Sequence, residues 1–112
     1  MDKDSGANQD RRRFKRSPLS TRVAVFRDGQ FTFEASVEVG EGGMCLEVKN
    51  FYSVGEMVQV IFFTSPSTYV MTEAEIVYKM NSDPQKYVGL RFLQPTSRDQ
   101  ESIRHYVANH KI

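Results

Sequence analysis

The feature that most constrains this fold is an alternation of apolar and polar residues on both sides of Asp28-Gly29. The segment LSTRVAVFRDGQFTFEASVEV, residues 19–39, alternates before and after this dipeptide. An Asp-Gly pair readily adopts the positive φ angles of a tight turn, and a period of two is typical of strands. The segment therefore predicts a β-hairpin. On its second strand we expect Phe31, Phe33, Ala35, Val37 and Val39 to face the core and Thr32, Glu34, Ser36 and Glu38 to face outward.

Four further runs have strand character: residues 44–48, 57–64, 69–80 and 86–93. Clusters rich in Gly, Pro, Asn, Asp and Ser, such as TSPS and NSDP, separate them. One face of these runs is expected to consist of Val58, Val60, Phe62, Val70, Thr72, Ala74, Ile76, Val88, Leu90 and Phe92. No helical pattern lies between the runs to make parallel crossovers, so we predict a mainly all-β fold, a six-stranded antiparallel β-barrel.

The chain ends in a different pattern, which predicts a C-terminal α-helix. After Pro95, either Thr96 or Ser97 can cap the helix. Apolar residues then recur at helical spacing at Ile103, Tyr106 and Val107. We expect this stripe to cover one open end of the barrel.

The length of 112 residues suits one domain with one core. We expect a flexible tail at residues 1–10, a basic arm at 11–18, and the barrel with its helix at 19–112. A single cysteine, Cys45, excludes an intramolecular disulfide and a Cys-based zinc site. The sequence has no signal-peptide pattern and no apolar run long enough to enter a membrane. We therefore expect a cytoplasmic protein without membrane insertion.

The positive charge of the chain is concentrated in RRRFKR, residues 11–16. The formal net charge is +1, yet these six positions hold five basic residues, whereas residues 17–112 carry nine basic and eleven acidic ones. A protein that holds duplex DNA usually spreads its basic residues over a face. The local cluster indicates a small anionic ligand and argues against DNA.

The sequence offers little support for catalysis, a metal site or a cofactor. His105 and His110 are five residues apart on the predicted helix, which separates them by about 140° around its axis. Glu73 and Glu75 share one strand face without a His or Lys beside them. No nucleophile and base are paired in the pattern. We predict that the protein is not an enzyme.

The segment EVGEGG, residues 38–43, follows the second strand of the hairpin and fits a glycine-rich turn. It lacks the spacing of a dinucleotide-binding fingerprint, and no helix follows it. With Val37 and Val39 expected to face the core, Glu38 and Gly40 are expected to face outward. A ligand bound there would lie on the outer wall of the barrel.

The two segments together resemble the signature of the PilZ domain family, bacterial receptors for cyclic di-GMP. Arg12 and Arg16 resemble its pair of arginines separated by three residues. Glu38, Gly40 and Gly43 occupy the positions of its second motif, Asp or Asn, any residue, Ser, two residues, Gly, with Glu in place of the acid or amide and Gly in place of Ser. YVGLRF, residues 87–92, resembles its last barrel strand.

This resemblance implies a non-catalytic second-messenger receptor that regulates motility or biofilm formation. The implied ligand is cyclic di-GMP, bound as a stacked pair of molecules, and the signal passes to a protein partner. Residues 10–18 are expected to become ordered over the Glu38 face when the ligand binds. The implied ligand-binding residues are Arg11, Arg12, Arg13, Arg16, Glu38, Gly40 and Gly43.

Two alternatives remain open at this point. A degenerate PilZ-like adaptor would bind no nucleotide and would act through protein contacts, which the changes at Glu38 and Gly40 and a possible apolar surface at Ile61 and Phe63 favour. Binding of single-stranded nucleic acid needs aromatic and basic residues along a groove. The polar strand faces here are acidic, so that function ranks last.

Overall fold

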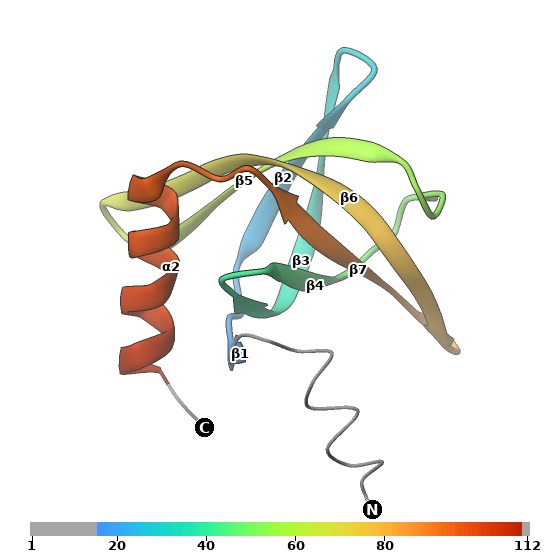
Figure 1. The fold of residues 1–112 in the computed structure, drawn as a ribbon. Helices are drawn as coiled ribbons and strands as arrows, with labels where there is room; N and C mark the ends of the chain where they lie inside the picture. The colour runs from blue at the N-terminus through green and yellow to red at the C-terminus, as the bar shows by residue number, and fades with distance from the viewer. Residues whose placement is uncertain (1–15, 111–112) are drawn as a thin grey trace, which may run out of the picture.

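The computed structural model describes residues 16–110. Six strands, β2 to β7, close into an antiparallel barrel, and a short strand β1 adds to its edge (Figure 1). Around the barrel the order is β3-β2-β5-β6-β7-β4, and pairing between β4 and β3 closes the ring. The elements are β1 Arg16–Pro18, β2 Arg22–Arg27, β3 Gln30–Gly40, β4 Gly43–Glu47, β5 Met57–Ser65, β6 Thr68–Ser82, β7 Gln85–Leu93 and α2 Ser97–Asn109. The predicted six-stranded barrel with a C-terminal helix is confirmed.

The hairpin turn and most of the predicted strand faces are also confirmed. Asp28 and Gly29 join β2 to β3 with φ values of 52° and 76°. The residues that the sequence groups on one face of β5, β6 and β7 are all buried, which confirms the grouping. The buried residues on these strands are Val58, Val60, Phe62, Val70, Thr72, Ala74, Ile76, Val88, Leu90 and Phe92.

Helix α2 covers the barrel beside β1, β3, β5 and β6, as Figure 1 shows. Thr96 is its N-cap, and the Thr96 hydroxyl accepts a hydrogen bond from the backbone N–H of Asp99 at 3.0 Å. Ile103 and Val107 are buried against the core, which confirms the predicted apolar stripe. Within residues 16–110, no helix has the length and apolar character needed to cross a membrane.

Strand β1 corrects the prediction that residues 10–18 become ordered only with a ligand. Arg16–Pro18 pair antiparallel with β3, Arg16 opposite Gly40 and Pro18 opposite Glu38. The Tyr106 hydroxyl on α2 also donates a hydrogen bond to the Pro18 carbonyl at 2.6 Å. The end of the predicted arm is therefore fixed to the barrel wall by backbone pairing. Residues 10–15 lie outside the described part of the chain.

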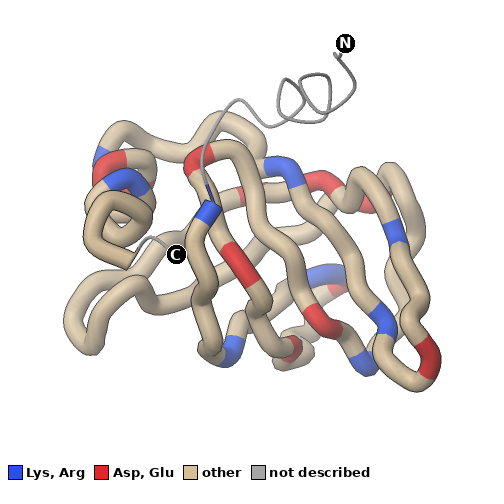
Figure 2. The backbone as a smooth tube through the Cα atoms, turned by 90° about the horizontal axis from the view of Figure 1, so that it is seen from below, with Lys and Arg blue, Asp and Glu red and all other residues tan. Residues whose placement is uncertain are grey.

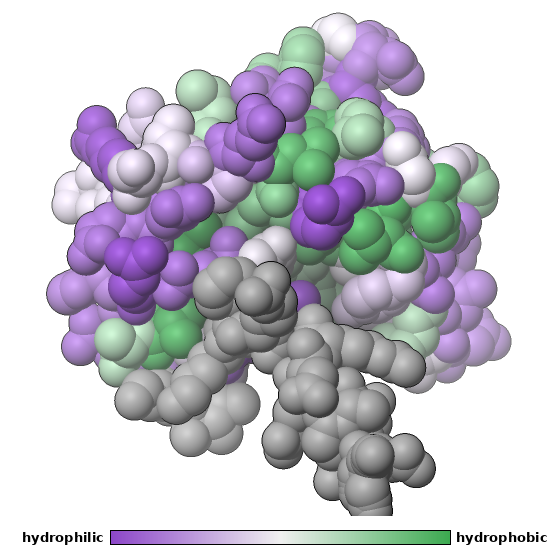
Figure 3. Space-filling model, viewed as in Figure 1, coloured by the Kyte–Doolittle hydropathy of each residue, from purple (hydrophilic) through white to green (hydrophobic). Residues whose placement is uncertain are grey.

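The first half of β3 faces the opposite way from the prediction. Glu34 and Ser36 are buried, whereas Phe31 and Phe33 are 54% and 57% exposed. A β-bulge explains the reversal, because Ser36 lies opposite Leu46 and Glu38 lies opposite Cys45 on β4, which leaves the residue between them unpaired. That residue, Val37, is exposed, so its predicted core position is also wrong. Figure 3 shows apolar residues gathered among hydrophilic ones on the face that it views.

Burial of Glu34 is possible because neutral donors surround its carboxylate. The backbone N–H of Lys49 donates to one oxygen at 2.9 Å, and the other accepts from the Asn50 amide at 2.8 Å and the Tyr52 hydroxyl at 2.6 Å. Burial raises the pKa of Tyr52, and its hydrogen bond to Glu34 raises it further. The network ties the loop between β4 and β5 to the barrel, on the side opposite α2 (Figure 1).

Candidate functional site

The pairing of β1 with β3 brings the two predicted motifs into contact. Arg16 Nη1 lies 3.3 Å from Glu38 Oε2, and the two side chains are 20% and 27% exposed. Both side chains therefore lie on the outer wall of the barrel, where neighbouring residues partly cover them. The outward position predicted for Glu38 is confirmed, although it arises from the bulge and not from inward packing of Val37.

The two glycines of the second motif are both buried, but they pack against different neighbours. Gly40 is buried at the end of β3, opposite Arg16. Gly43 begins β4 opposite Arg91, and a Cβ atom placed there would lie 2.0 Å from the backbone oxygen of Leu90. Gly43 is thus required for the close approach of β4 to β7, whether or not a ligand binds. Binding roles for both glycines stay predictions.

The remaining predicted binding residues, Arg11, Arg12 and Arg13, lie outside the described residues. Arg16 directly follows the basic run and is fixed on the wall, so that run joins the barrel next to Glu38. The structure therefore brings together Arg16, Glu38 and Gly40, and it places Gly43 at the start of the neighbouring strand.

A row of residues extends from Glu38 across the wall. Strand pairing places Cys45 of β4 opposite Glu38, Gly89 of β7 opposite Cys45, and Tyr78 of β6 opposite Gly89. The Tyr78 ring lies against Gly89, because a Cβ atom at position 89 would be 2.0 Å from Tyr78 Cε2. Burial raises the pKa of Tyr78, and interactions with Cys45 raise it further. We name the set Arg16, Glu38, Cys45, Gly89 and Tyr78 the polar row.

The sequence prediction missed Tyr78 because a second β-bulge changes the alternation in β6. Ile76 pairs with Leu90 and Tyr78 pairs with Gly89, so Val77 is unpaired. One signal pointed to this site, a glycine inside a strand pattern, which often marks the close approach of another group. Gly89 in YVGLRF is that glycine, and the group is an aromatic ring 11 residues away in sequence.

Residues 38–43 contain a second carboxylate, Glu41, which pairs with an arginine of α2. Arg104 donates to its two oxygens from Nε at 3.1 Å and from Nη2 at 3.2 Å, and Arg104 also pairs with Glu101 at 2.7 Å. The negative charges of Glu38 and Glu41 thus each lie beside an arginine. In Figure 2, basic and acidic residues are likewise interspersed around the barrel.

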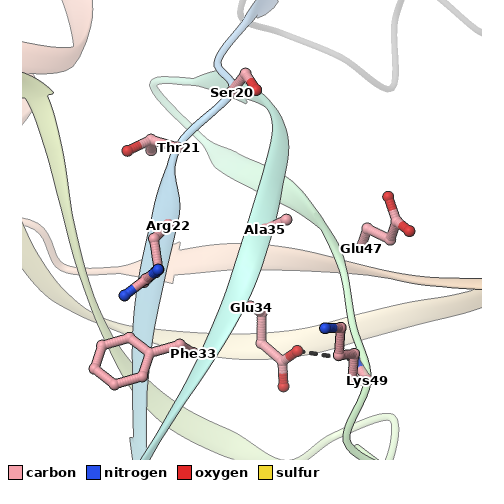
Figure 4. A pocket seen from close by; sticks show the side chains of 8 residues that line it. All are labelled: Ser20, Thr21, Arg22, Phe33, Glu34, Ala35, Glu47 and Lys49. Carbon is pink, nitrogen blue, oxygen red and sulfur yellow. Dashed lines mark hydrogen bonds between the residues drawn. The ribbon is translucent and has the colours of Figure 1, made fainter.

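A pocket lies where β3 pairs with β2 on one side and with β4 on the other (Figure 4). Its walls carry both signs of charge, from Arg22 and Lys49 and from Glu34 and Glu47. The Arg22 guanidinium lies 5.5 Å from the centre of the Phe33 ring. Among residues 16–110, no group of three His, Cys, Asp or Glu side chains is placed to hold a metal ion.

Comparison of the sequence with protein families gives one assignment that spans almost the whole chain. The PilZ domain model matches residues 10–109. The chain therefore belongs to the PilZ domain family, as its motifs and its six-stranded barrel suggest. A search of curated proteins finds no match.

Solved structures with the same fold include several PilZ proteins. The PilZ domain of Escherichia coli YcgR, solved with c-di-GMP, has a TM-score of 0.70 and 14% identity over 90% of this chain and 92% of that one. The Bacillus subtilis inhibitor of motility, MotI/DgrA, has a TM-score of 0.78 and 17% identity over 88% of this chain. This chain covers 50% of MotI/DgrA, about half its length. Borreliella burgdorferi PlzA, in complex with c-di-GMP, has a TM-score of 0.59 and 11% identity over 94% and 56% of the two chains.

Proposed function

We propose that this protein is a non-catalytic receptor for cyclic di-GMP, which it binds on the outer wall between the basic arm and the polar row. The observation that carries the proposal is the contact of Arg16 with Glu38, which joins the two family motifs on one wall. Membership of the PilZ family and the c-di-GMP complex of the E. coli YcgR domain support the choice of ligand.

Arg16 is suited to bind such a ligand because its present ion pair is weak. The pair with Glu38 is partly exposed, and pairs of this kind contribute about 0–1 kcal/mol. Arg16 therefore loses little when its guanidinium turns toward a phosphate or toward O6 and N7 of a guanine. A guanidinium makes both contacts as a planar fork, which an ammonium group reproduces poorly.

Glu38 and Tyr78 supply complementary contacts on the same row. A carboxylate accepts hydrogen bonds, so Glu38 is proposed to receive the N–H groups of the Watson-Crick edge of a guanine. The ring of Tyr78, 38% exposed on the wall, offers a surface on which a purine can stack. Gly40 provides no hydroxyl, which costs about 0.5–1.5 kcal/mol of binding relative to a serine that hydrogen-bonds the ligand.

The basic arm completes the proposed site. Arg11, Arg12 and Arg13 add positive charge next to Arg16, as a dianionic ligand requires, and a stacked pair of ligands would double that requirement. Binding then changes the surface around β1, which a cytoplasmic protein partner is proposed to recognise. Tyr106 contacts Pro18, so α2 lies next to this surface.

Titration calorimetry tests the proposal. We expect heat on addition of cyclic di-GMP, and a loss of affinity of about tenfold or more for Arg12→Ala and for Arg16→Ala. Cyclic di-AMP is the matched control ligand, because adenine lacks the O6 acceptor and the N1–H donor of guanine. Arg98→Ala, an exposed arginine of α2, is the control variant and should bind normally. Absence of heat with cyclic di-GMP at high concentration would contradict the proposal.

A pair of variants at Tyr78 tests the aromatic contact. Tyr78→Ala removes the stacking surface and should weaken binding by about 1–3 kcal/mol. Tyr78→Phe keeps the ring and should bind within a few-fold of the wild type. Equal loss in both variants would assign the effect to the hydroxyl and exclude stacking as its cause.

A degenerate adaptor is the second candidate, and one observation favours it. Ile61 and Phe63 lie on a wall of the barrel with several exposed apolar side chains, which suits a protein contact. The adaptor binds no nucleotide, so the same calorimetric titration separates it from the receptor.

A further inference from the structure

The barrel carries a second, apolar wall away from the polar row. Strand pairing aligns Phe33 of β3, Ala24 of β2, Ile61 of β5 and Met71 of β6 in one row across four strands. The rows on either side add more apolar side chains. We name this surface the apolar wall, and its main members are Phe31, Phe33, Ile61, Phe63, Tyr69 and Met71.

The apolar wall is large for the surface of a small domain. Five of its side chains are about half exposed, with values of 47–57% for Phe31, Phe33, Phe63, Tyr69 and Met71. At roughly 200 Å² for a large side chain, these five present on the order of 500 Å². Two such walls face to face would bury on the order of 1,000 Å², the area at which specific protein interfaces begin.

Two opposite charges lie diagonally across Ile61, one on each neighbouring strand. Arg22 precedes Ala24 by two residues on β2, and Glu73 follows Met71 by two residues on β6. Strands β2 and β6 both run antiparallel to β5, so they are parallel to each other. Arg22 and Glu73 therefore lie on opposite sides of the central apolar row, and both are exposed.

This arrangement is complementary to itself. Consider a second copy of the chain placed face to face with the first. When the twofold axis lies in the plane of contact and runs diagonally across the wall through Ile61, Arg22 of each copy meets Glu73 of the other. The same rotation brings Phe63 of each copy to Met71 of the other, an apolar contact of the self-matching kind that an isologous interface needs. We propose that the apolar wall is the interface of a homodimer, with a second copy of this chain as its occupant.

The proposed dimer leaves the proposed nucleotide site accessible. The polar row crosses β3, β4, β7 and β6, whereas the centre of the apolar wall lies on β5. Dimer formation can therefore be measured without nucleotide. Failure of the dimer would not affect the nucleotide proposal, and failure of nucleotide binding would not affect the dimer.

Sedimentation equilibrium of the full chain over a range of concentrations is the test. We expect a monomer–dimer equilibrium in the wild type. Arg22→Glu and Glu73→Arg each place like charges together and should raise the dissociation constant about tenfold. The combined variant Arg22→Glu/Glu73→Arg restores opposite charges and should associate like the wild type. Arg98→Glu, on α2, is the charge-reversal control and should not change association.

Three results would overturn the proposal. The first is a wild type that stays monomeric at all concentrations. The second is association that persists in Ile61→Asp, which puts a charge at the centre of the wall, while circular dichroism shows an intact barrel. The third is a combined charge variant that dimerises no better than the two single variants, because the proposed pairing of Arg22 with Glu73 predicts rescue.

Discussion

The two halves of β3 follow opposite rules, although they belong to one continuous strand. Before Val37, the strand buries the polar residues Glu34 and Ser36 and exposes Phe33. After Val37, it buries Val39 and turns Glu38 outward to Arg16. One half contributes a structural carboxylate inside the molecule, and the other contributes a carboxylate to the candidate ligand site.

A single extra residue can therefore give one strand two tasks. The bulge at Val37 shifts the alternation of β3 by one residue. Glu34 and Ser36 therefore face the interior before the bulge, whereas Glu38 faces the outer wall after it. A buried carboxylate is tolerated in the first half because three donors from Lys49, Asn50 and Tyr52 satisfy it.

Deletion of Val37 should have the largest effect. Without the extra residue, one half of β3 must turn its side chains to the wrong face, which disrupts either the Glu34 network or the packing of Val39. We expect a loss of at least about 4 kcal/mol in the free energy of unfolding, a large part of the total for a small domain. Urea unfolding followed by circular dichroism measures it. Val37→Ala keeps the bulge and should cost less than about 1 kcal/mol; equal losses in the two variants would show that the bulge is unimportant.

Glu34→Ala should have the next largest effect. It leaves the buried Tyr52 hydroxyl and two other donors without their acceptor, and we expect a loss of about 3 kcal/mol in unfolding free energy. Phe33→Ala, at the neighbouring exposed position, should cost less than about 1 kcal/mol. Urea unfolding compares the two variants. A greater cost for the phenylalanine would mean that the first half of β3 faces the way its apolar residues suggest.

Gly43→Ala tests the strand that pairs with the second half of β3. The new methyl group would overlap the backbone oxygen of Leu90, and we expect a loss of about 2 kcal/mol in thermal or urea unfolding. Gly89→Ala is the matched control, because the nearest atoms there belong to the Tyr78 ring, which can turn toward solvent. It should cost less stability and should weaken cyclic di-GMP binding. The reverse order of stabilities would contradict the packing described for Gly43.

The smallest expected effect is a pH-dependent change in folding stability that comes from Glu56. This residue lies in the loop between β4 and β5 that the Glu34 network ties to the barrel. Desolvation raises the pKa of Glu56, but hydrogen bonds from the Ser53 N–H and Arg27 outweigh it and lower the pKa overall. A lowered pKa in the folded state contributes stability above the unfolded value, about 4.3, and this is lost as pH falls through the folded value. Glu56→Gln should therefore be less stable than wild type by about 1 kcal/mol or less at neutral pH, and the gap should close in acid. A gap that is constant across urea unfolding at neutral and acidic pH would contradict this.

The sequence was sufficient to predict the elements whose partners are close along the chain or follow a simple period. The Asp28-Gly29 turn, the inner faces of β5 and β7, and the stripe of Ile103 and Val107 are of this kind. The two motifs were expected to lie on one wall with a ligand between them, but the direct contact of Arg16 with Glu38 was not predicted.

The faces of β3 and the position of Tyr78 could not be predicted in the same way. Glu34 is buried only because Asn50 and Tyr52, 16 and 18 residues away, supply donors from a loop without a strand or helix pattern. Tyr78 reaches the polar row only because β6 contains a bulge. An alternating pattern shows that a strand has two different faces. It shows neither which face lies inside the barrel nor where an extra residue shifts the pattern by one position.

The most direct test of the proposed ligand site is a titration of isotope-labelled protein with cyclic di-GMP, followed by amide chemical shifts. We expect saturable changes at Arg16, at residues 38–43 and at Tyr78 and Gly89, with no comparable changes at Ile61 or Met71 on the apolar wall. No changes at all, or changes confined to the apolar wall or to the exposed face of α2, would contradict binding at the polar row.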